Sequence, residues 1–252
     1  MHSTVLITGG TGTLGRSLVE VFYERGYQVI FTGTKETAAN KLIDDLNKKS
    51  SGNFEPIFYC IDFFQENALK DLSDFLSSIK VNIQILINNA RSLNYLNLVD
   101  HLPSRDCWLK EYTMDVVVPY ELSLSLLRLN HPLKSIVNIA SIYGIVAPRP
   151  GIYKNAGTDS PVQYSVAKAA QIHMSKELAI RLVDKNVRVN SISPAGFGSM
   201  PNEFKENYLR HCPQNRVLGI SEIANAVVFL AEDSASGITG HNLVVDGGWT
   251  VW

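Results

Sequence analysis

The sequence TGGTGTLG at residues 8–15 constrains the fold of this chain more than any other stretch. It follows a short β-branched run, TVLIT at residues 4–8, and precedes a segment of helical periodicity at residues 14–25. Glycines between a strand and a helix permit a tight turn and let the backbone approach a pyrophosphate, whose charge then faces unpaired N–H groups at the positive end of the helix. The stretch therefore predicts dinucleotide binding. The residues of this turn expected at the cofactor are Gly9, Thr11, Gly12, Thr13, Leu14 and Gly15.

The remainder of the chain repeats the alternation of strand and helix. Runs rich in β-branched and other apolar residues predict strands at residues 4–8, 28–32, 55–61, 83–87, 135–140, 187–192 and 242–245. Segments of helical periodicity lie between them, at residues 14–25, 36–48, 66–79, 104–129, 161–185 and 221–231. This alternation is typical of parallel strands joined by crossover helices. We therefore expect an α/β fold, a Rossmann-like doubly wound parallel sheet of seven strands flanked by helices.

Composition limits the kind of protein and its partners. The 252 residues include 23 basic and 24 acidic side chains, so no net field attracts nucleic acid or an anionic membrane. No linker, repeat or low-complexity tract marks a domain boundary, which predicts a single domain over residues 1–252. The three cysteines lack CxxC spacing, the histidines lack metal-ligand spacing, and no signal peptide or membrane-spanning run is evident. We expect a cytoplasmic protein that binds a small-molecule substrate and no metal, nucleic acid or membrane.

The end of the second predicted strand bears on the choice between NAD and NADP. An acidic residue there would hold the ribose 2′-hydroxyl of NAD, whereas a basic residue favours the 2′-phosphate of NADP. The sequence at this place is Gly33-Thr34-Lys35, with no carboxylate before Glu36, and Arg16 lies within reach. Thr34 and Lys35 are therefore expected at the cofactor, and NADP is preferred over NAD.

Tyr164 and Lys168 form the candidate acid–base pair. They stand at positions i and i+4 of a predicted helix and therefore share one face. A phenol is a poor acid–base catalyst at neutral pH, and a neighbouring ammonium favours the phenolate form. The pair could then move a proton to or from an alcohol oxygen.

Together these features resemble the short-chain dehydrogenase/reductase family, in its single-domain type, over nearly the whole chain. Further matching motifs follow the later strands and lie near the C-terminus: Asp62, Asn88-Asn89-Ala90, Ser141, Ser193-Pro194, and residues 238–240 and 245–248. The resemblance implies an NAD(P)-dependent oxidoreductase that interconverts a secondary alcohol and a ketone.

The resemblance also assigns roles to individual residues. Ser141 would orient and polarise the substrate carbonyl, Tyr164 would donate or accept the proton, and Lys168 would hold the nicotinamide ribose and assist Tyr164. Asp115 takes the fourth catalytic position, where the family usually has asparagine. The residues implied at the cofactor beyond the glycine-rich turn are Thr34, Lys35, Asp62, Asn88, Ala90, Tyr164, Lys168, Pro194, Phe197 and Ser199.

Several positions depart from the family pattern. Asp115 places a carboxylate where an amide is usual, and Arg91 replaces the glycine that usually follows Asn-Ala. Arg91 is either turned to solvent or aimed at an anion in the substrate pocket. Residues 147–160 form an insertion before Tyr164, which is either an inert surface loop or, as is usual for loops at this edge of such sheets, part of the pocket. Residues 197–216 would form a short substrate lid.

Two narrower resemblances leave the substrate and the reaction open. The middle glycine at position 12 is similar to the spacing of the extended, sugar-nucleotide-modifying branch, which makes a nucleotide-sugar epimerase or dehydratase one alternative. The insertion and the residues after it resemble reductases of bacterial flagellin-modification and nonulosonic-acid sugar pathways, which implies a sugar-derived substrate whose charge Arg91 or Arg149 could meet. A non-catalytic dinucleotide-binding sensor or scaffold is another alternative, supported by Asp115 and Arg91.

The predicted helix at residues 104–129 bears on assembly. It is apolar around much of its surface, and such a helix is more easily buried between subunits than left in water. The family resemblance points the same way, to a homotetramer or homodimer built on this helix and the one that carries Tyr164.

Overall fold

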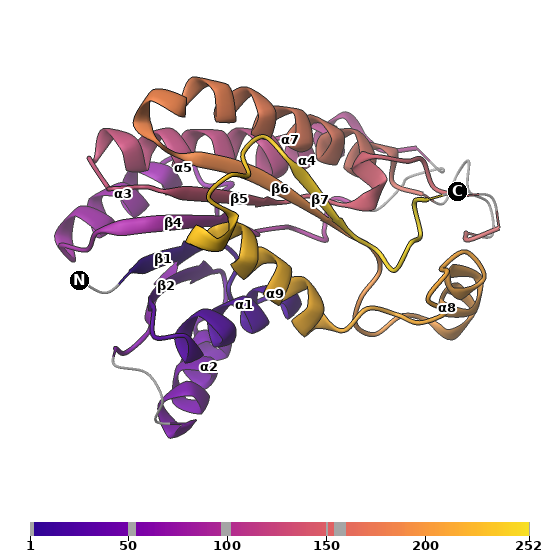
Figure 1. The fold of residues 1–252 in the computed structure, drawn as a ribbon, viewed down its shortest axis with the longest axis horizontal. Helices are drawn as coiled ribbons and strands as arrows, with labels where there is room; N and C mark the ends of the chain where they lie inside the picture. The colour runs from indigo at the N-terminus through magenta and orange to yellow at the C-terminus, as the bar shows by residue number, and fades with distance from the viewer. Residues whose placement is uncertain (1–2, 50–53, 97–101, 150, 154–159, 252) are drawn as a thin grey trace.

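The computed structural model describes residues 3–49, 54–96, 102–149, 151–153 and 160–251 of the chain (Figure 1). Its strands are β1 Thr4–Ile7, β2 Gln28–Gly33, β3 Ile57–Cys60, β4 Ile83–Asn88, β5 Ser135–Ile139, β6 Arg188–Pro194 and β7 Asn242–Val245. They form one seven-stranded sheet in the order β3-β2-β1-β4-β5-β6-β7, and every neighbouring pair is parallel. This arrangement confirms the predicted doubly wound sheet.

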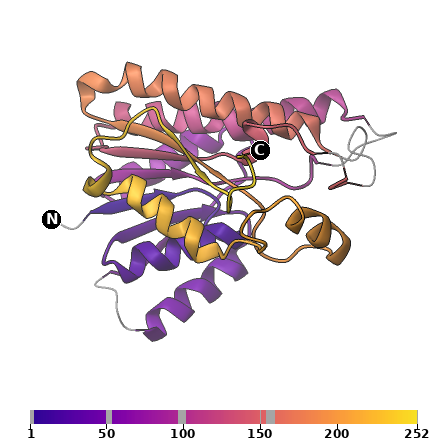
Figure 2. The same ribbon diagram turned by 45° about the vertical axis from the view of Figure 1, so that its right-hand side comes forward.

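Helices cover both faces of the sheet. They are α1 Thr13–Glu24, α2 Glu36–Lys49, α3 Ala68–Ser78, α4 Arg105–Tyr112, α5 Val118–Arg128, α7 Val162–Arg181, α8 Asn202–Leu209 and α9 Ile220–Ala231. Figures 1 and 2 show α1, α2 and α9 on one face, and α3, α4, α5 and α7 on the other. Phe22 and Val227 are buried in the first layer, and Leu122 and Leu178 in the second. Every residue of β1 and of β5 is buried, and most are apolar, because both faces of the sheet are covered.

The helix predicted over residues 104–129 is interrupted by a π-helical turn at Thr113–Val117, which joins α4 to α5. Pro119 supplies a physical reason. Proline has no N–H, so it cannot donate to the carbonyl of Asp115 four residues earlier, and regular α-helical bonding fails there. Turns of this kind inside helices are frequent at functional sites.

The C-terminal half contains a helix that the apolar pattern did not predict. α8 lies within residues 197–216, the proposed lid, and projects beyond the carboxyl end of the sheet in both views (Figures 1 and 2). Tyr208 is its one buried residue, so the helix has no apolar stripe by which the sequence could reveal it. The helix predicted at residues 161–185 ends at Arg181, and a 3-10 turn at Val183–Lys185 follows it.

Two further findings concern the chain as a whole. No helix within the described residues has the length and apolarity needed to cross a bilayer. Cys60, Cys107 and Cys212 are all described, and none of the three forms a disulfide.

Candidate active site

The glycine-rich turn lies between β1 and α1, at the carboxyl ends of the strands. Gly9 has a φ of +67°, and a Cβ there would lie 2.7 Å from the Cα of Ala90. A Cβ at Gly15 would overlap the carbonyl oxygen of Gly9, so the packing of the turn itself requires both glycines. Gly12 differs, because the nearest protein atom to a Cβ there is the Gly9 oxygen at 3.4 Å. The absence of a side chain at Gly12 leaves open space beside the first N–H groups of α1, which fits a pyrophosphate.

Asn89 fixes this turn against the end of β4. Its side-chain amide donates to the carbonyl oxygens of Thr8, at 2.9 Å, and Gly9, at 3.1 Å. The hydroxyl oxygen of Thr8 accepts from the backbone N–H groups of Asn89 and Ala90, both at 3.0 Å. The motif after β4 therefore sets the position of the cofactor turn.

A buried polar chain links the centre of the sheet to α7. Asn88 donates to the side-chain oxygen of Asn138 at 2.8 Å, and Asn138 donates to the hydroxyl of Ser175 at 2.9 Å. Asn88 is thus placed in the sheet that supports the site.

The residues expected at the adenosine end lie at the carboxyl ends of β2 and β3. Thr34 and Lys35 are exposed just beyond β2. Arg16 lies 3.4 Å from an Asp45 carboxylate oxygen, so its charge is compensated. No ion pair joins Lys35 to any residue in the described ranges. Asp62 is exposed after β3, and its carboxylate accepts from the backbone N–H of Phe64 at 3.0 Å.

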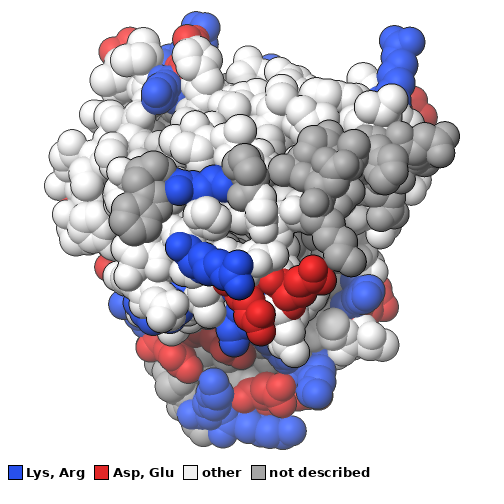
Figure 3. Space-filling view, turned by 90° about the vertical axis from the view of Figure 1, so that its right-hand side faces the viewer, with Lys and Arg blue, Asp and Glu red and all other residues white. Residues whose placement is uncertain are grey.

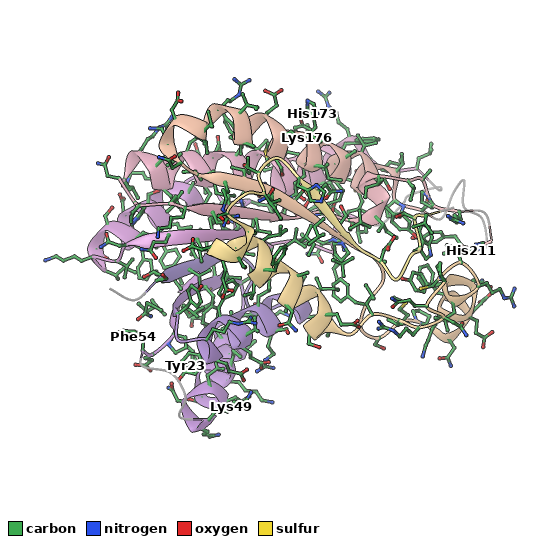
Figure 4. All side chains as sticks on the ribbon, in the orientation of Figure 1. Tyr23, Lys49, Phe54, His173, Lys176 and His211 are labelled. Carbon is green, nitrogen blue, oxygen red and sulfur yellow. The ribbon has the colours of Figure 1, made fainter. Side chains whose placement is uncertain are left out.

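Tyr164 and Lys168 lie on the inner face of α7, opposite His173 and Lys176, which point away from the sheet (Figure 4). Lys168 is buried, with only 4% of the residue exposed. It donates to the carbonyl oxygen of Ile139 at 2.7 Å, to Asp115 Oδ1 at 3.0 Å and to Gln171 Oε1 at 3.1 Å. An ammonium has three N–H donors, and all three are occupied.

Asp115 reaches Lys168 from the π-helical turn. Its side chain is 1% exposed, and its second carboxylate oxygen, Oδ2, has no hydrogen-bond partner among the described residues. The structure therefore brings together Asp115 and Lys168 as a buried ion pair.

Glu111 and Gln171 also belong to this buried cluster, although sequence reasoning missed both. Glu111 lies on α4, four residues before Asp115, and is 3% exposed. Burial, together with the nearby charge of Asp115, raises the pKa of Glu111 to about 7, while Arg91 and Lys168 act in the opposite direction. The helical spacings of Glu111 from Asp115 and of Gln171 from Lys168 were the signals that could have found them.

Arg91 lies over the candidate catalytic tyrosine. Its Cζ atom is 4.1 Å from the centroid of the Tyr164 ring, whereas the ammonium of Lys168 is 5.8 Å from it. Arg91 is exposed. Figure 3 faces the carboxyl ends of the strands and shows Lys and Arg side chains near the middle of this surface.

Ser141 follows β5 and begins a 3-10 turn at Ile142–Gly144. Its hydroxyl oxygen accepts from the backbone N–H of Tyr143 at 3.2 Å. A Cβ at Gly144 would lie 2.8 Å from the backbone carbon of Lys168, so glycine lets this turn pack directly on α7. The close packing places Ser141 at the helix that carries Tyr164.

The remaining predicted residues lie at the end of β6 and in the segment that follows it. Pro194 is the last residue of β6, Phe197 forms an isolated bridge with Leu218, and Ser199 is exposed. In the insertion at 147–160, residues 150 and 154–159 lie outside the described part of the chain.

The described part of the insertion packs on the C-terminal segment and the lid. Arg149 stacks on the Trp249 ring, with its Cζ 4.9 Å from the centroid, and donates to the Trp249 carbonyl at 3.1 Å. The rings of Tyr153 and Phe204 are 5.4 Å apart. The insertion and α8 are thus in direct contact.

Comparison with known proteins agrees with this geometry. Residues 10–250 match the family model described as enoyl-(acyl carrier protein) reductase. An uncharacterised oxidoreductase, YmfI of Bacillus subtilis (strain 168), is 32% identical over 258 residues, which cover 99% of each chain. A solved short-chain dehydrogenase from Leptospira borgpetersenii serovar Hardjo-bovis with bound NAD+ has a TM-score of 0.83 at 25% identity and covers 99% of this chain and 93% of its own. A 4-hydroxyisoleucine dehydrogenase complexed with NADH has a TM-score of 0.83 at 26% identity over 100% of both chains.

The fold, the glycine-rich turn and these matches define an NAD(P)-dependent oxidoreductase that acts on CH–OH groups. More narrowly, the chain belongs to the short-chain dehydrogenase/reductase family.

Proposed function

We propose that this protein interconverts a secondary alcohol and a ketone, with Tyr164 as the proton donor and acceptor. The observation that carries the proposal is the position of Tyr164 on α7, one turn before Lys168 of the buried Lys168–Asp115 pair, on the helix against which the turn after Ser141 packs. The bound cofactor supplies or accepts the hydride. Tyr164 holds the proton at its phenol oxygen and passes it to the carbonyl oxygen during reduction.

Ser141, Lys168 and Asp115 would orient the substrate and the cofactor and set the charge near Tyr164. The oxygen of Ser141 already accepts from Tyr143, so the hydroxyl hydrogen can be directed at the substrate carbonyl. Lys168 would hold the nicotinamide ribose after exchanging one of its three acceptors, and the neutral Gln171 amide is the one most easily replaced. Asp115 stabilises the ammonium and partly cancels its field at Tyr164.

Net turnover tests the proposal against its alternatives. Purified protein is incubated with NADPH or NADH and a panel of ketones and keto sugars, and cofactor absorbance is followed. The proposal expects net oxidation of the cofactor. An epimerase recycles its cofactor and gives product without an absorbance change, whereas a sensor binds cofactor and forms no product.

The substrate proposed is sugar-derived, and residues 147–160 and 197–216 would shape its pocket as the insertion and the lid. The contact between Tyr153 and Phe204 supports a shared role for the two segments. A cytoplasmic location is also proposed, and three cysteines without a disulfide are in keeping with a reducing compartment.

We expect tighter binding of NADPH than of NADH, because Lys35 at the end of β2 is free to meet a 2′-phosphate. Lys35→Glu should lower the ratio of the two affinities by about tenfold or more, since a charge-assisted hydrogen bond is lost and a repulsion is added. Lys41→Glu makes the same charge change on an exposed position of α2 and should leave the ratio unchanged. Fluorescence titration measures both, and a wild-type preference for NADH contradicts the prediction.

Assembly is proposed to be a homotetramer or homodimer through α7 and the helical segment at residues 105–128, which includes α4 and α5. Their outer faces expose Leu109, Tyr112, Val162 and Val166. Val162 and Val166 also line a hollow of about 360 Å³ beside Ile145. Exposed apolar side chains grouped in this way are typical of protein interfaces.

Val166→Asp is expected to shift the protein to a smaller assembly, because it would bury a charge in this interface. Val183→Asp is the matched control, since Val183 is also exposed but lies beyond the end of α7. Light scattering at micromolar concentration measures both. A wild-type monomer would refute the proposed assembly.

A further inference from the structure

The guanidinium of Arg91 lies beside the candidate catalytic tyrosine, and its N–H donors have no acceptor among the described residues. Its guanidinium lies 4.1 Å from the centroid of the Tyr164 ring, at stacking distance. It forms no hydrogen bond or ion pair with any residue that the structure describes, and the side chain is exposed. A guanidinium stacked by its face keeps its N–H donors at the edge, where they match the two oxygens of a carboxylate.

Among the described residues, no ionised acid pairs with Arg91 to compensate its charge. Lys168 and Asp115 neutralise each other as a buried pair, with 3.0 Å between nitrogen and oxygen. Glu111 is the acid on which Arg91 acts electrostatically, and burial raises the pKa of Glu111 to about 7. Glu111 therefore holds its proton for much of the time at neutral pH, so it does not supply a full opposing charge.

We propose that Arg91 binds a carboxylate of the substrate and thereby selects oxo acids and hydroxy acids, including acidic sugars. The inference rests on the proposed function, in which Tyr164 exchanges its proton with the substrate oxygen. Because the guanidinium carbon of Arg91 lies 4.1 Å from the centroid of the Tyr164 ring, a carboxylate bound to Arg91 would lie only a few bonds from a carbonyl bound to Tyr164. The substrate class that meets both groups is a compound with the carboxylate close to the reacting carbon, such as a 2-oxo or 3-oxo acid.

A binding experiment with simple probes tests Arg91 without requiring turnover. Protein saturated with NADP+ is titrated with oxalate, malonate and tartrate, and in parallel with the neutral diamides of the same acids, by calorimetry. At least one carboxylate should bind the wild-type protein about 10- to 100-fold more tightly than its diamide, as expected for charge-assisted hydrogen bonds. Arg91→Gln should remove this preference and leave the diamide affinity unchanged.

Two further variants separate the geometry of Arg91 from its charge. Arg91→Lys keeps the charge but loses the planar fork, and should retain only part of the preference. Lys110→Gln removes a cation that stacks 4.7 Å from the Phe64 ring instead, and should bind as the wild type does. If no carboxylate binds, or if Arg91→Gln binds carboxylates as tightly as the wild-type protein, the proposal is wrong.

Parallel turnover assays distinguish failure of this proposal from failure of the proposed function. Reduction of 3-oxobutanoate is compared with reduction of its amide, both with NADPH. Turnover of both compounds with equal kcat/KM in wild type and Arg91→Gln would overturn the role of Arg91 and leave the oxidoreductase intact. Arg91-dependent carboxylate binding without reduction of any ketone or oxo acid would support the anion site and count against the proposed reaction.

Discussion

Replacing Tyr164 with phenylalanine is expected to lower kcat by about 10³-fold, the order of magnitude that general acid–base catalysis contributes. The ring still packs in the buried face of α7 and still accepts the guanidinium of Arg91 on its surface. Only the exchangeable proton is lost. Affinity for NADPH should therefore change by no more than about threefold, a small effect because a single neutral hydrogen bond is removed.

Steady-state kinetics and a fluorescence titration of the same preparation measure the two effects together. Tyr143→Phe is the control, because it removes a second phenol, which is half-buried, from the turn that follows Ser141. Burial raises the pKa of Tyr143, so its phenol stays protonated at neutral pH and should not exchange a proton with the substrate. If Tyr164→Phe retains substantial turnover and Tyr143→Phe loses it, the proposed assignment of the proton to Tyr164 is wrong.

The glycine-rich turn and the sheet were predictable because their signals are local. Gly9 and Gly15 are required within the turn, and the apolar runs of β1, β4 and β5 follow from burial on both faces. The π-helical turn was also accessible in principle, since Pro119 removes the donor to the Asp115 carbonyl. α8 has no apolar stripe, so periodicity could not reveal it.

The electrostatic composition of the site was harder to predict, because it depends on contacts between elements distant in the sequence. Asp115 and Lys168 are 53 residues apart, so no local pattern joins them; it was the family resemblance that placed both at the catalytic site, and the packing of the π-helical turn against α7 makes them an ion pair. The spacing of Glu111 from Asp115 places both on one face of a helix, but only the structure shows that Glu111 is buried. The stacking of Arg91 on Tyr164 likewise joins the end of β4 to α7.

The second large effect is expected in the pH dependence of stability, and Glu111 is its origin. The pKa of Glu111 is raised from its ordinary value of 4.5 to about 7, mainly by burial and then by Asp115. Between these pH values the folded protein keeps a proton that the unfolded chain has released. The stability that Glu111 contributes is therefore fully present below about pH 4.5 and is lost as the pH rises through about 7. The free energy of unfolding should fall by about 2–3 kcal/mol over this range.

Glu111→Gln removes this titration and keeps a neutral side chain of similar shape. The variant should therefore become more stable than the wild type only as the pH rises. Urea unfolding at pH 5 and pH 8 is expected to show nearly equal stability at the lower pH and a variant more stable by about 2–3 kcal/mol at the higher one.

Glu222→Gln is the control, because the pKa of Glu222 is shifted in the opposite direction. Arg216 and the backbone N–H of Gly219 lower the pKa of Glu222 to about 2, so its stabilising contribution is already complete at pH 5 and the variant should be less stable by a similar amount at both pH values. A stability difference between Glu111→Gln and wild type that stays constant from pH 5 to pH 8 would show that Glu111 is ionised in the folded protein, and that Arg91 already has its anionic partner.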